Sequence, residues 1–407
     1  MLLLFIPCSI SAQWIRTNGI HGGYSITAIG DTFFTGTENI YRSTDNCNTW
    51  TETFADSTSI RPFTGFAVNG NTIFAGRGYD IGTGIYRSTD YGASWTPVDT
   101  TLMNRSIGML LAHNGTVYAG TTKGLYRSSD NGDNWLPTSQ KNAIRSCVIK
   151  DSVILVGGYE NGIWRSTDNG ATWAYFCDGL HTSTVVHGVY RIPSVNCLAV
   201  QEEYVFAGLS DHGIYRSTIN GSRWTKVLSI NRVNTFAVQG DMIIAGIVGI
   251  VQSERGQIVH STDNGDTWEN TLPMSSEVKG VYDLCIESDT AYAATKNGIW
   301  YRPLSELRTA THTRVARATE KISRCVIRSP SPADKYVQIS FTLTHSESVT
   351  ITLFNLAGNS KKTQVNGIYS SGTHTLRLAM HSMAAGMYFI TVRTGNAHYR
   401  KHVPVVW

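Results

Sequence analysis

The chain repeats short apolar runs that are separated by polar, glycine-containing turns. The segments GFAVNGNTIFAG at 65–76, LLAHNGTVYAG at 110–120 and FAVQGDMIIAG at 236–246 each break at such a turn and end in Ala-Gly. Asn-Gly between two apolar runs favours a β-hairpin, because both turn residues can adopt positive φ. Each segment therefore predicts a pair of antiparallel strands.

A third and a fourth run complete each repeat. The third run is typified by GIYRS, and after a polar turn a tryptophan begins the fourth run. These tryptophans lie about 44 residues apart on average, and four short strands in a repeat of that length are typical of a β-propeller blade. They are Trp50, Trp95, Trp135, Trp173, Trp224 and Trp268.

A seventh repeat is incomplete, and the N-terminus supplies its missing part. Residues 285–304 contain the first three runs but stop where a fourth should begin. QWIRT at 13–17 resembles the fourth run and has no preceding runs of its own. We therefore predict an all-β chain with a seven-bladed propeller at 13–303, closed by the strand at 13–17.

The turn before each tryptophan has the pattern S-x-D-x-G-x-x-W. Aspartate in a tight turn accepts hydrogen bonds from N–H groups a few residues on, and glycine supplies a positive φ. Because one copy lacks the aspartate and another lacks the glycine, we expect a structural role rather than a catalytic one. The positions are Ser43, Asp45, Trp50, Ser88, Asp90, Gly92, Trp95, Ser128, Asp130, Gly132, Trp135, Ser166, Asp168, Gly170, Trp173, Ser217, Gly221, Trp224, Ser261, Asp263, Gly265 and Trp268.

This pattern is the Asp-box, or BNR repeat. With it, residues 13–303 resemble the seven-bladed propellers of the sialidase, sortilin and photosystem II assembly-factor superfamily, which also includes xyloglucanase modules. The resemblance implies that the Asp-boxes lie away from the functional face. It leaves function open, because the group contains both enzymes and binding scaffolds.

The C-terminal residues 326–407 alternate apolar strands with glycine turns and predict a small Ig-like β-sandwich. PSPA, then LFNLAG, AAGMYFITV and a basic end resemble a type A sorting domain of the type IX secretion system. That resemblance implies recognition by the secretion machinery and a secreted or outer-membrane surface location. A fibronectin-like module that binds carbohydrate is the alternative. Residues 1–12 are expected to be a signal peptide and 304–325 a linker.

Charge is uneven along the chain. The net charge of the whole chain is +4. The residues from 304 onward have a net charge of +9, so the preceding residues have a net charge of −5. A mildly acidic propeller argues against nucleic acid as its partner. We expect a monomer whose ligand is a glycan, a peptide or a protein.

The cysteines permit a disulfide without requiring one. Cys177 and Cys197 flank the longest insertion between repeats and could close it, although Cys197 could equally be a small core residue. The chain has no C-x-x-C pair, and we expect neither a metal site nor a cofactor.

One segment allows an enzymatic alternative. VYRIPSV at 189–195 resembles the Arg-Ile-Pro motif of sialidases, in which the arginine binds a carboxylate, and Asp211 follows in the next loop as a general acid. However, this motif follows the fourth Asp-box, whereas in sialidases it precedes the first. The alternative function is therefore a glycoside hydrolase, sialidase-like or xyloglucanase-like, with Arg191 and Asp211 as its candidate residues.

Arg191 also has counterparts in other repeats. Arg61 and Arg105 lie 15 residues before the glycine that closes the second run, and Arg191 lies 17 before it, so the three share parity along their strands. Arg61, Arg105 and Arg191 could form a partial ring that attracts an anionic ligand, or each could pair with a neighbouring blade or with solvent. We expect a secreted or surface-attached binding or adhesion scaffold more than an enzyme.

Overall fold

The computed structural model divides into two compact units, residues 1–315 and 316–407. It describes residues 13–309 except 21, 56–59, 79–83, 99–101, 103–104, 181–184, 187–188, 191–193, 250–255, 272–273 and 275–277. It also describes residues 322–405 except 329–335, 344–345, 356–359, 380–385 and 395–396. The expected signal peptide at 1–12 therefore lies outside the described residues.

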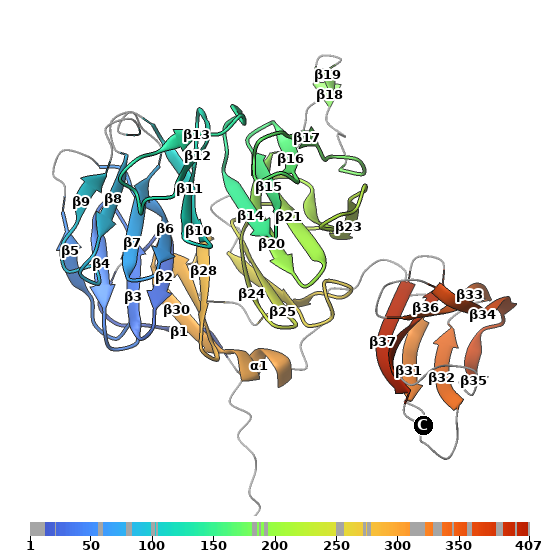
Figure 1. Cartoon of the computed structure of the whole chain (residues 1–407). Helices are drawn as coiled ribbons and strands as arrows, with labels where there is room; N and C mark the ends of the chain where they lie inside the picture. Colours follow the sequence, from blue (N-terminus) through green and yellow to red (C-terminus); the bar gives the residue numbers. More distant parts are fainter. Residues whose placement is uncertain are drawn as a thin grey trace, which may run out of the picture. The chain divides into compact units, whose positions relative to one another are not determined.

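The first unit is a ring of seven four-stranded antiparallel sheets, as predicted, here numbered as blades 1 to 7 in chain order (Figure 1). Blade 1 contains β2 (Ser25–Ile29), β3 (Thr32–Gly36), β4 (Ile40–Ser43) and β5 (Thr51–Phe54). Blade 2 contains β6 (Phe63–Asn69), β7 (Thr72–Arg77), β8 (Ile85–Ser88) and β9 (Thr96–Val98). Blade 3 contains β10 (Ile107–His113), β11 (Thr116–Thr121), β12 (Gly124–Ser128) and β13 (Leu136–Pro137).

The next three blades repeat this order. Blade 4 contains β14 (Ser146–Lys150), β15 (Val153–Gly158), β16 (Gly162–Ser166) and β17 (Ala174–Tyr175). Blade 5 contains β20 (Val195–Gln201), β21 (Tyr204–Leu209), β22 (Gly213–Thr218) and β23 (Thr225–Leu228), and blade 6 contains β24 (Val233–Gln239), β25 (Met242–Ile247), β26 (Gln257–Ser261) and β27 (Glu269–Asn270). The short hairpin of β18 (Val185–Val186) and β19 (Val189–Tyr190) lies in the connection between blades 4 and 5.

Blade 7 is completed by the N-terminus. It contains β28 (Val281–Glu287), β29 (Thr290–Thr295) and β30 (Gly298–Pro303), and β1 (Ile15–Arg16) pairs with β30 as the fourth strand. Trp14 beside it is 4% exposed and donates its indole N–H to the Thr271 hydroxyl of the neighbouring blade over 3.1 Å. The first residues of the propeller thus hold its last blade to blade 6.

The first strand of every blade lies innermost and contacts the first strands of its two neighbours around the whole ring, from β2 to β28 and back to β2. The second strands β7, β15 and β25 are buried along their entire length, because both of their faces are covered by adjacent blades. This explains their continuous apolar runs. The core consists of clusters between blades rather than of one central cluster.

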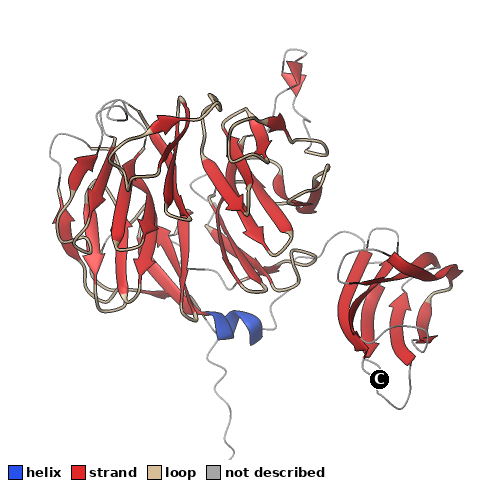
Figure 2. Ribbon diagram, in the orientation of Figure 1, coloured by secondary structure: helices blue, strands red, loops and turns tan. Residues whose placement is uncertain are grey.

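The segment expected to be a linker begins with a helix. α1 (Leu304–Thr309) follows β30 directly, and its Leu304 and Leu307 are each 1% exposed within the core cluster of blades 6 and 7. The prediction that the linker begins at residue 304 is therefore wrong for these six residues. Figure 2 shows α1 in blue against strands that otherwise dominate both units.

The second unit contains two antiparallel sheets, consistent with the predicted small β-domain. One sheet has the order β31 (Ile322–Arg328), β32 (Tyr336–Leu343) and β35 (Gly372–Ala379). The other has the order β34 (Ser360–Tyr369), β33 (Glu347–Asn355), β36 (Gly386–Thr394) and β37 (Ala397–Val405). β31 begins within the predicted linker.

Candidate functional site

Each Asp-box turn is closed by hydrogen bonds from polar side chains. In the second box, the Ser88 hydroxyl donates to Asp90 Oδ1 over 2.7 Å and accepts from the Gly92 N–H over 2.8 Å. Asp90 accepts the N–H of Ser94 over 2.9 Å and its hydroxyl over 2.6 Å. The bonds from Ser94 and Ser88 hold the pKa of Asp90 well below its usual range, because they stabilise the carboxylate. Asp90 therefore stays ionised at neutral pH and is not suited to act as a general acid.

The other boxes with an aspartate repeat these bonds at Asp45, Asp130, Asp168 and Asp263. The same cause lowers the pKa of Asp130 and of Asp168 to about 2. In the copy without an aspartate, the Ser217 hydroxyl instead donates to a backbone carbonyl of its own turn over 2.8 Å.

The box tryptophans pack across the boundary between blades. Trp95 lies edge-on to Phe34 of blade 1 at 6.2 Å between ring centroids, and Trp135 lies edge-on to Phe74 of blade 2 at 6.4 Å. Both tryptophans are more than nine-tenths buried. Each box therefore contributes to the contact between its own blade and the preceding one.

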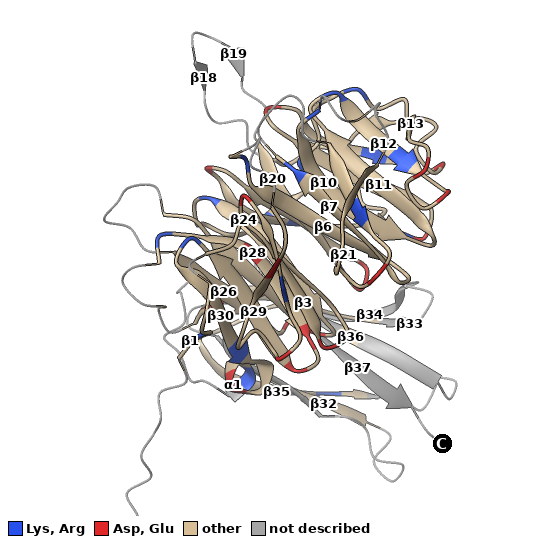
Figure 3. Ribbon diagram, turned by 90° about the vertical axis from the view of Figure 1, so that its left-hand side faces the viewer, with Lys and Arg blue, Asp and Glu red and all other residues tan. Residues whose placement is uncertain are grey.

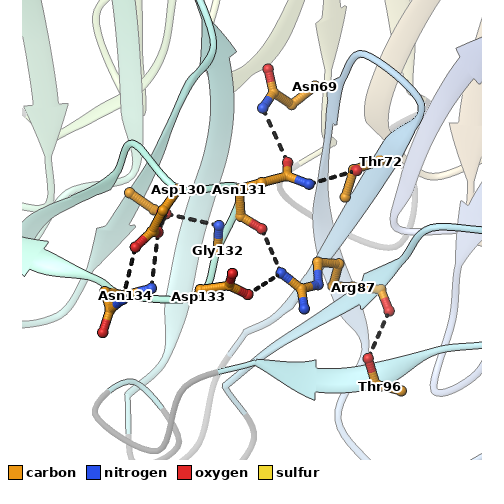
Figure 4. Close-up of polar contacts among 10 residues, drawn as sticks. Asn69, Thr72, Arg87, Thr96, Asp130, Asn131, Gly132, Asp133 and Asn134 are labelled. Carbon is orange, nitrogen blue, oxygen red and sulfur yellow. Dashed lines mark hydrogen bonds and ion pairs between the residues drawn. The ribbon is translucent and has the colours of Figure 1, made fainter.

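An arginine of the third strand also joins a blade to the next box. Arg87 on β8 donates to the Asn131 carbonyl over 2.7 Å and pairs with Asp133 over 2.6 Å, both in the box of blade 3 (Figure 4). Arg165 likewise reaches a carbonyl in the box of blade 5 over 2.7 Å, and Arg216 pairs with an aspartate in the box of blade 6 over 2.9 Å. These three arginines belong to the Arg-Ser that recurs in the third run, and each of them joins its blade to the box of the next blade.

The box turns and the turns between first and second strands share one end of the propeller, here called the box end. Asn69, at the first turn of blade 2, donates to Asn131 in the box of blade 3 over 3.2 Å. Further exposed acids occupy this end at Asp31, Asp151 and Asp241. Figure 3 shows acidic residues in red in turns close to the labels β3 and β13. The end where the innermost strands begin is here called the mouth end.

One residue of each blade forms a ring at the mouth end. It lies twelve positions before an equivalent residue of the second strand, which is Gly36 in blade 1 and Ala294 in blade 7. All seven are at least partly exposed, although the residue before each of them is buried. This mouth ring consists of Tyr24, Thr64, Gly108, Arg145, Asn196, Asn234 and Tyr282.

β-bulges explain this exposure in five of the blades. The pairing of the first two strands shifts at the mouth-ring residue of blades 2, 3, 5, 6 and 7. A bulge inserts an unpaired residue and turns its side chain away from the regular alternation. The mouth ring was missed from the sequence because strand parity was counted without these bulges, whereas the constant spacing of twelve residues is visible in the sequence.

Arg145 is the cation of the mouth ring. Its backbone N–H is held by the Gly157 carbonyl over 2.9 Å, but its guanidinium makes no hydrogen bond or ion pair within the part of the chain that the structure describes. The side chain is partly buried, and its charge acts on the thiol of Cys197 on the next inner strand, as does the charge of Asp283. A guanidinium in this position can receive an anionic group in a bidentate manner.

Aromatic and amide groups complete the ring. The rings of Tyr24 and Tyr282 lie 5.2 Å apart between centroids, tilted by 47°. Asn196 donates to the Val233 carbonyl over 3.0 Å, and Asn234 donates to the Tyr282 carbonyl over 2.7 Å. The amides are thereby fixed by the neighbouring inner strands.

Asp283 is the one carboxylate near the mouth end of the described inner strands, since Glu287 lies at the other end of β28. Its oxygens accept the Ile26 N–H over 2.9 Å, the Leu284 N–H over 2.9 Å and the Thr235 hydroxyl over 3.1 Å. Burial raises the pKa of Asp283 to about 6, against the opposing effect of these hydrogen bonds. Asp283 thus connects blade 7 to blades 6 and 1.

The candidate residues singled out from the sequence are described only in part. Arg61 is exposed before β6, and the guanidinium of Arg105 lies 5.0 Å from the Tyr126 ring centroid of its own blade. Asp211 is exposed in the turn between β21 and β22. Arg191 lies outside the described residues, so the proposed ring of Arg61, Arg105 and Arg191 stays a prediction.

The suggested disulfide between Cys177 and Cys197 is wrong, because both thiols are free. The Cys177 sulfur accepts the Ile163 N–H over 3.0 Å, whereas Cys197 is buried in the core between blades 5 and 6. Cys47, which replaces the glycine of the first box, is also buried. It has a positive φ of 64°, and its neighbour Asn46 has a φ of 55°.

Among the described residues, no cluster of three or more His, Cys, Asp or Glu side chains could hold a metal ion. Within the same residues, no helix has the length and apolar character needed to cross a membrane.

Comparison with known families decides the nature of the second unit. Residues 329–405 match the secretion system C-terminal sorting domain family. These residues are a type IX secretion sorting domain. The sorting domain implies export of the protein and an extracellular or cell-surface location, with recognition by the type IX machinery.

Solved structures share the propeller fold at low sequence identity. YCF48 bound to D1 peptide is 17% identical with a TM-score of 0.55, covering 72% of this chain and 96% of its own. The GH74 xyloglucanase from Xanthomonas campestris is 17% identical (TM-score 0.56; 81% of this chain, 59% of its own), and the GH74 enzyme of Niastella koreensis is 13% identical (TM-score 0.56; 96% and 74%). None of the curated proteins compared with the chain matches it.

Proposed function

We propose that the exported propeller is a binding or adhesion scaffold and that its ligand is held at the mouth ring. The observation that carries this proposal is the guanidinium of Arg145, which has no hydrogen-bonding partner among the described residues. Burying part of a cation without a partner costs free energy, which a ligand would recover by pairing with it. The fixed amides and the two tyrosines of the same ring supply further groups of the kind found in ligand sites.

The alternative function is a glycoside hydrolase, as the GH74 enzymes share the fold. Such enzymes need two carboxyl groups about 5–10 Å apart across the scissile bond. The mouth end of the described inner strands offers Asp283, whose oxygens already accept three hydrogen bonds from three strands. These three hydrogen bonds favour a structural role for Asp283 over a role as a catalytic acid or base.

The two functions are separated by incubating the full-length protein with xyloglucan, polygalacturonate and an acidic peptide. Isothermal titration calorimetry measures binding, and release of reducing ends measures hydrolysis. We expect binding of at least one polymer without cleavage. Cleavage that is abolished in Asp283→Asn, or no binding to any of them, would overturn the proposal.

The sialidase-like version of the enzyme has its own test. Hydrolysis of a fluorogenic sialoside is compared between the full-length protein and its Arg191→Ala variant. We expect no turnover by either protein. Turnover that disappears in the variant would give the Arg-Ile-Pro motif a catalytic role.

A further inference from the structure

The composition of the mouth ring is asymmetric, and the asymmetry follows from the order of the blades. Arg145 belongs to blade 4, which is three blades from blade 1 and three from blade 7. Tyr24 and Tyr282 come from those two blades and contact each other. The cation therefore lies on the side of the ring opposite the aromatic pair.

The two remaining sides of the ring also differ. Between Arg145 and Tyr282 lie the amides of Asn196 and Asn234, in blades 5 and 6. On the other side, blades 3 and 2 contribute Gly108 and Thr64. The Thr64 hydroxyl donates a hydrogen bond to the Ile107 carbonyl over 3.1 Å. One flank thus presents polar groups, and the other presents small side chains.

The amides are held in defined orientations before any ligand arrives. Asn196 donates to the Val233 carbonyl and accepts the Ser210 hydroxyl over 3.1 Å, so both ends of its amide are oriented. Asn234 uses its NH₂ group toward the Tyr282 carbonyl, which leaves its carbonyl oxygen to accept a hydroxyl. Fixed acceptors and donors of this kind recognise hydroxyl groups at little entropic cost.

Charge restricts where an anionic group of a ligand can lie. The Arg145 guanidinium attracts an anion to blade 4, whereas the Asp283 carboxylate on the inner strand of blade 7 disfavours one near the tyrosines, although the charges of both groups act on the Cys197 thiol of blade 5. A ligand that satisfies both needs an apolar ring face at one edge, hydroxyls along its flank and a carboxylate at the other edge.

Going beyond the proposed function and resting on it, we infer that the mouth ring binds a carboxylate-bearing pyranose of an acidic polysaccharide. The C–H face of the sugar packs on Tyr24 and Tyr282, and its carboxylate pairs with Arg145. Its hydroxyls meet Asn196 and Asn234.

The test uses the full-length protein, with oligogalacturonate as the probe and its carboxyl-reduced galactan form as the matched neutral sugar. We expect oligogalacturonate to bind and the reduced form to bind at least tenfold more weakly. Arg145→Gln should weaken oligogalacturonate binding roughly ten- to hundredfold, the usual range for hydrogen bonds to a charged group. It should leave the residual affinity for the reduced form unchanged.

Two further variants keep the result interpretable. Tyr24→Ala should weaken both sugars, whereas Arg127→Gln, an exposed arginine on β12, should change neither. Thermal unfolding shows whether each variant is folded. Equal binding of both sugars, or no effect of Arg145→Gln, would overturn the acidic-sugar inference. The scaffold proposal would still stand if the mouth-ring variants lose affinity for the sugar that binds.

A peptide ligand gives a different pattern. Poly-glutamate that binds as tightly as oligogalacturonate, and without dependence on Tyr24, would also overturn the inference, because carboxylate alone would then suffice. If neither sugar nor peptide binds, and no cleavage occurs, the scaffold proposal itself fails.

Discussion

The box glycine of blade 3 offers a quantitative test of how Asp-boxes join neighbouring blades. Gly132 has a φ of +92°, and a Cβ added there would lie 2.6 Å from Cε1 of Phe74 in blade 2. Gly115, in the first turn of the same blade, has a φ of +76°, but a Cβ there would have no atom within 4 Å. Alanine at either position strains the backbone, whereas only Gly132→Ala also displaces a neighbouring blade.

The two effects can be separated by magnitude. Left-handed backbone costs a residue with a side chain about 1–2 kcal/mol, which is the whole expected effect of Gly115→Ala. Overpacking against Phe74 adds about 1–3 kcal/mol, so Gly132→Ala should lower the free energy of unfolding by about 2–5 kcal/mol. Urea denaturation of the full-length protein, followed by tryptophan fluorescence, measures the difference between the two variants.

Equal destabilisation by both substitutions would refute this reasoning. It would mean that Phe74 moves aside without cost and that the box contributes only its own turn to stability. The first box shows that a side chain at this position can be accommodated, because Cys47 stands there in place of glycine and is fully buried. Its neighbour in blade 7 is Tyr292 rather than phenylalanine.

Three further outcomes are expected. Arg87→Ala should lower the free energy of unfolding by about 1 kcal/mol through loss of a partly exposed ion pair to the next box, and Arg127→Ala should have a smaller effect in the same denaturation assay. Because the pKa of Asp283 is raised from 3.8 to about 6 in the folded protein, the folded state binds the carboxyl proton more tightly than the unfolded state does. This proton binding contributes fully to stability below about pH 4, and the contribution is lost as the pH rises from 4 to 6. The wild type should lose up to about 3 kcal/mol over that range relative to Asp283→Asn, and a flat difference would contradict the assignment. Mass spectrometry of non-reduced, alkylated peptides should find Cys177 and Cys197 separately, and a linked pair would contradict the structure.

Much of the fold could be predicted because its repeats are local. The hairpin turns, the box turns and the tryptophans are sequence signals within single blades, and their number gives seven blades. The N-terminal strand could be placed because QWIRT matches a fourth strand that the last repeat lacks. α1 could not, because six residues with two leucines show no helical periodicity by themselves. Leu304 and Leu307 are helical through burial against blades 6 and 7.

The mouth ring was harder to predict because it depends on contacts between blades. Strand parity could not place Arg145 in a ring with the equivalent residues, because the bulges of five other blades invalidate a count by parity. The aromatic pair Tyr24 and Tyr282 joins residues that are more than 250 positions apart, so only ring closure brings them together. Cys177 and Cys197 looked pairable because they flank one insertion, yet their strands direct them into different clusters.

The most direct test of the account is to locate the ligand on the propeller by hydrogen exchange. Exchange of the full-length protein is measured by mass spectrometry with and without saturating oligogalacturonate, and in parallel with xyloglucan. The account predicts slower exchange at 143–147, 194–197 and 281–284 with the ligand that binds, and unchanged exchange in the box turn at 128–135. Protection of the box turns without protection at the mouth end would contradict it.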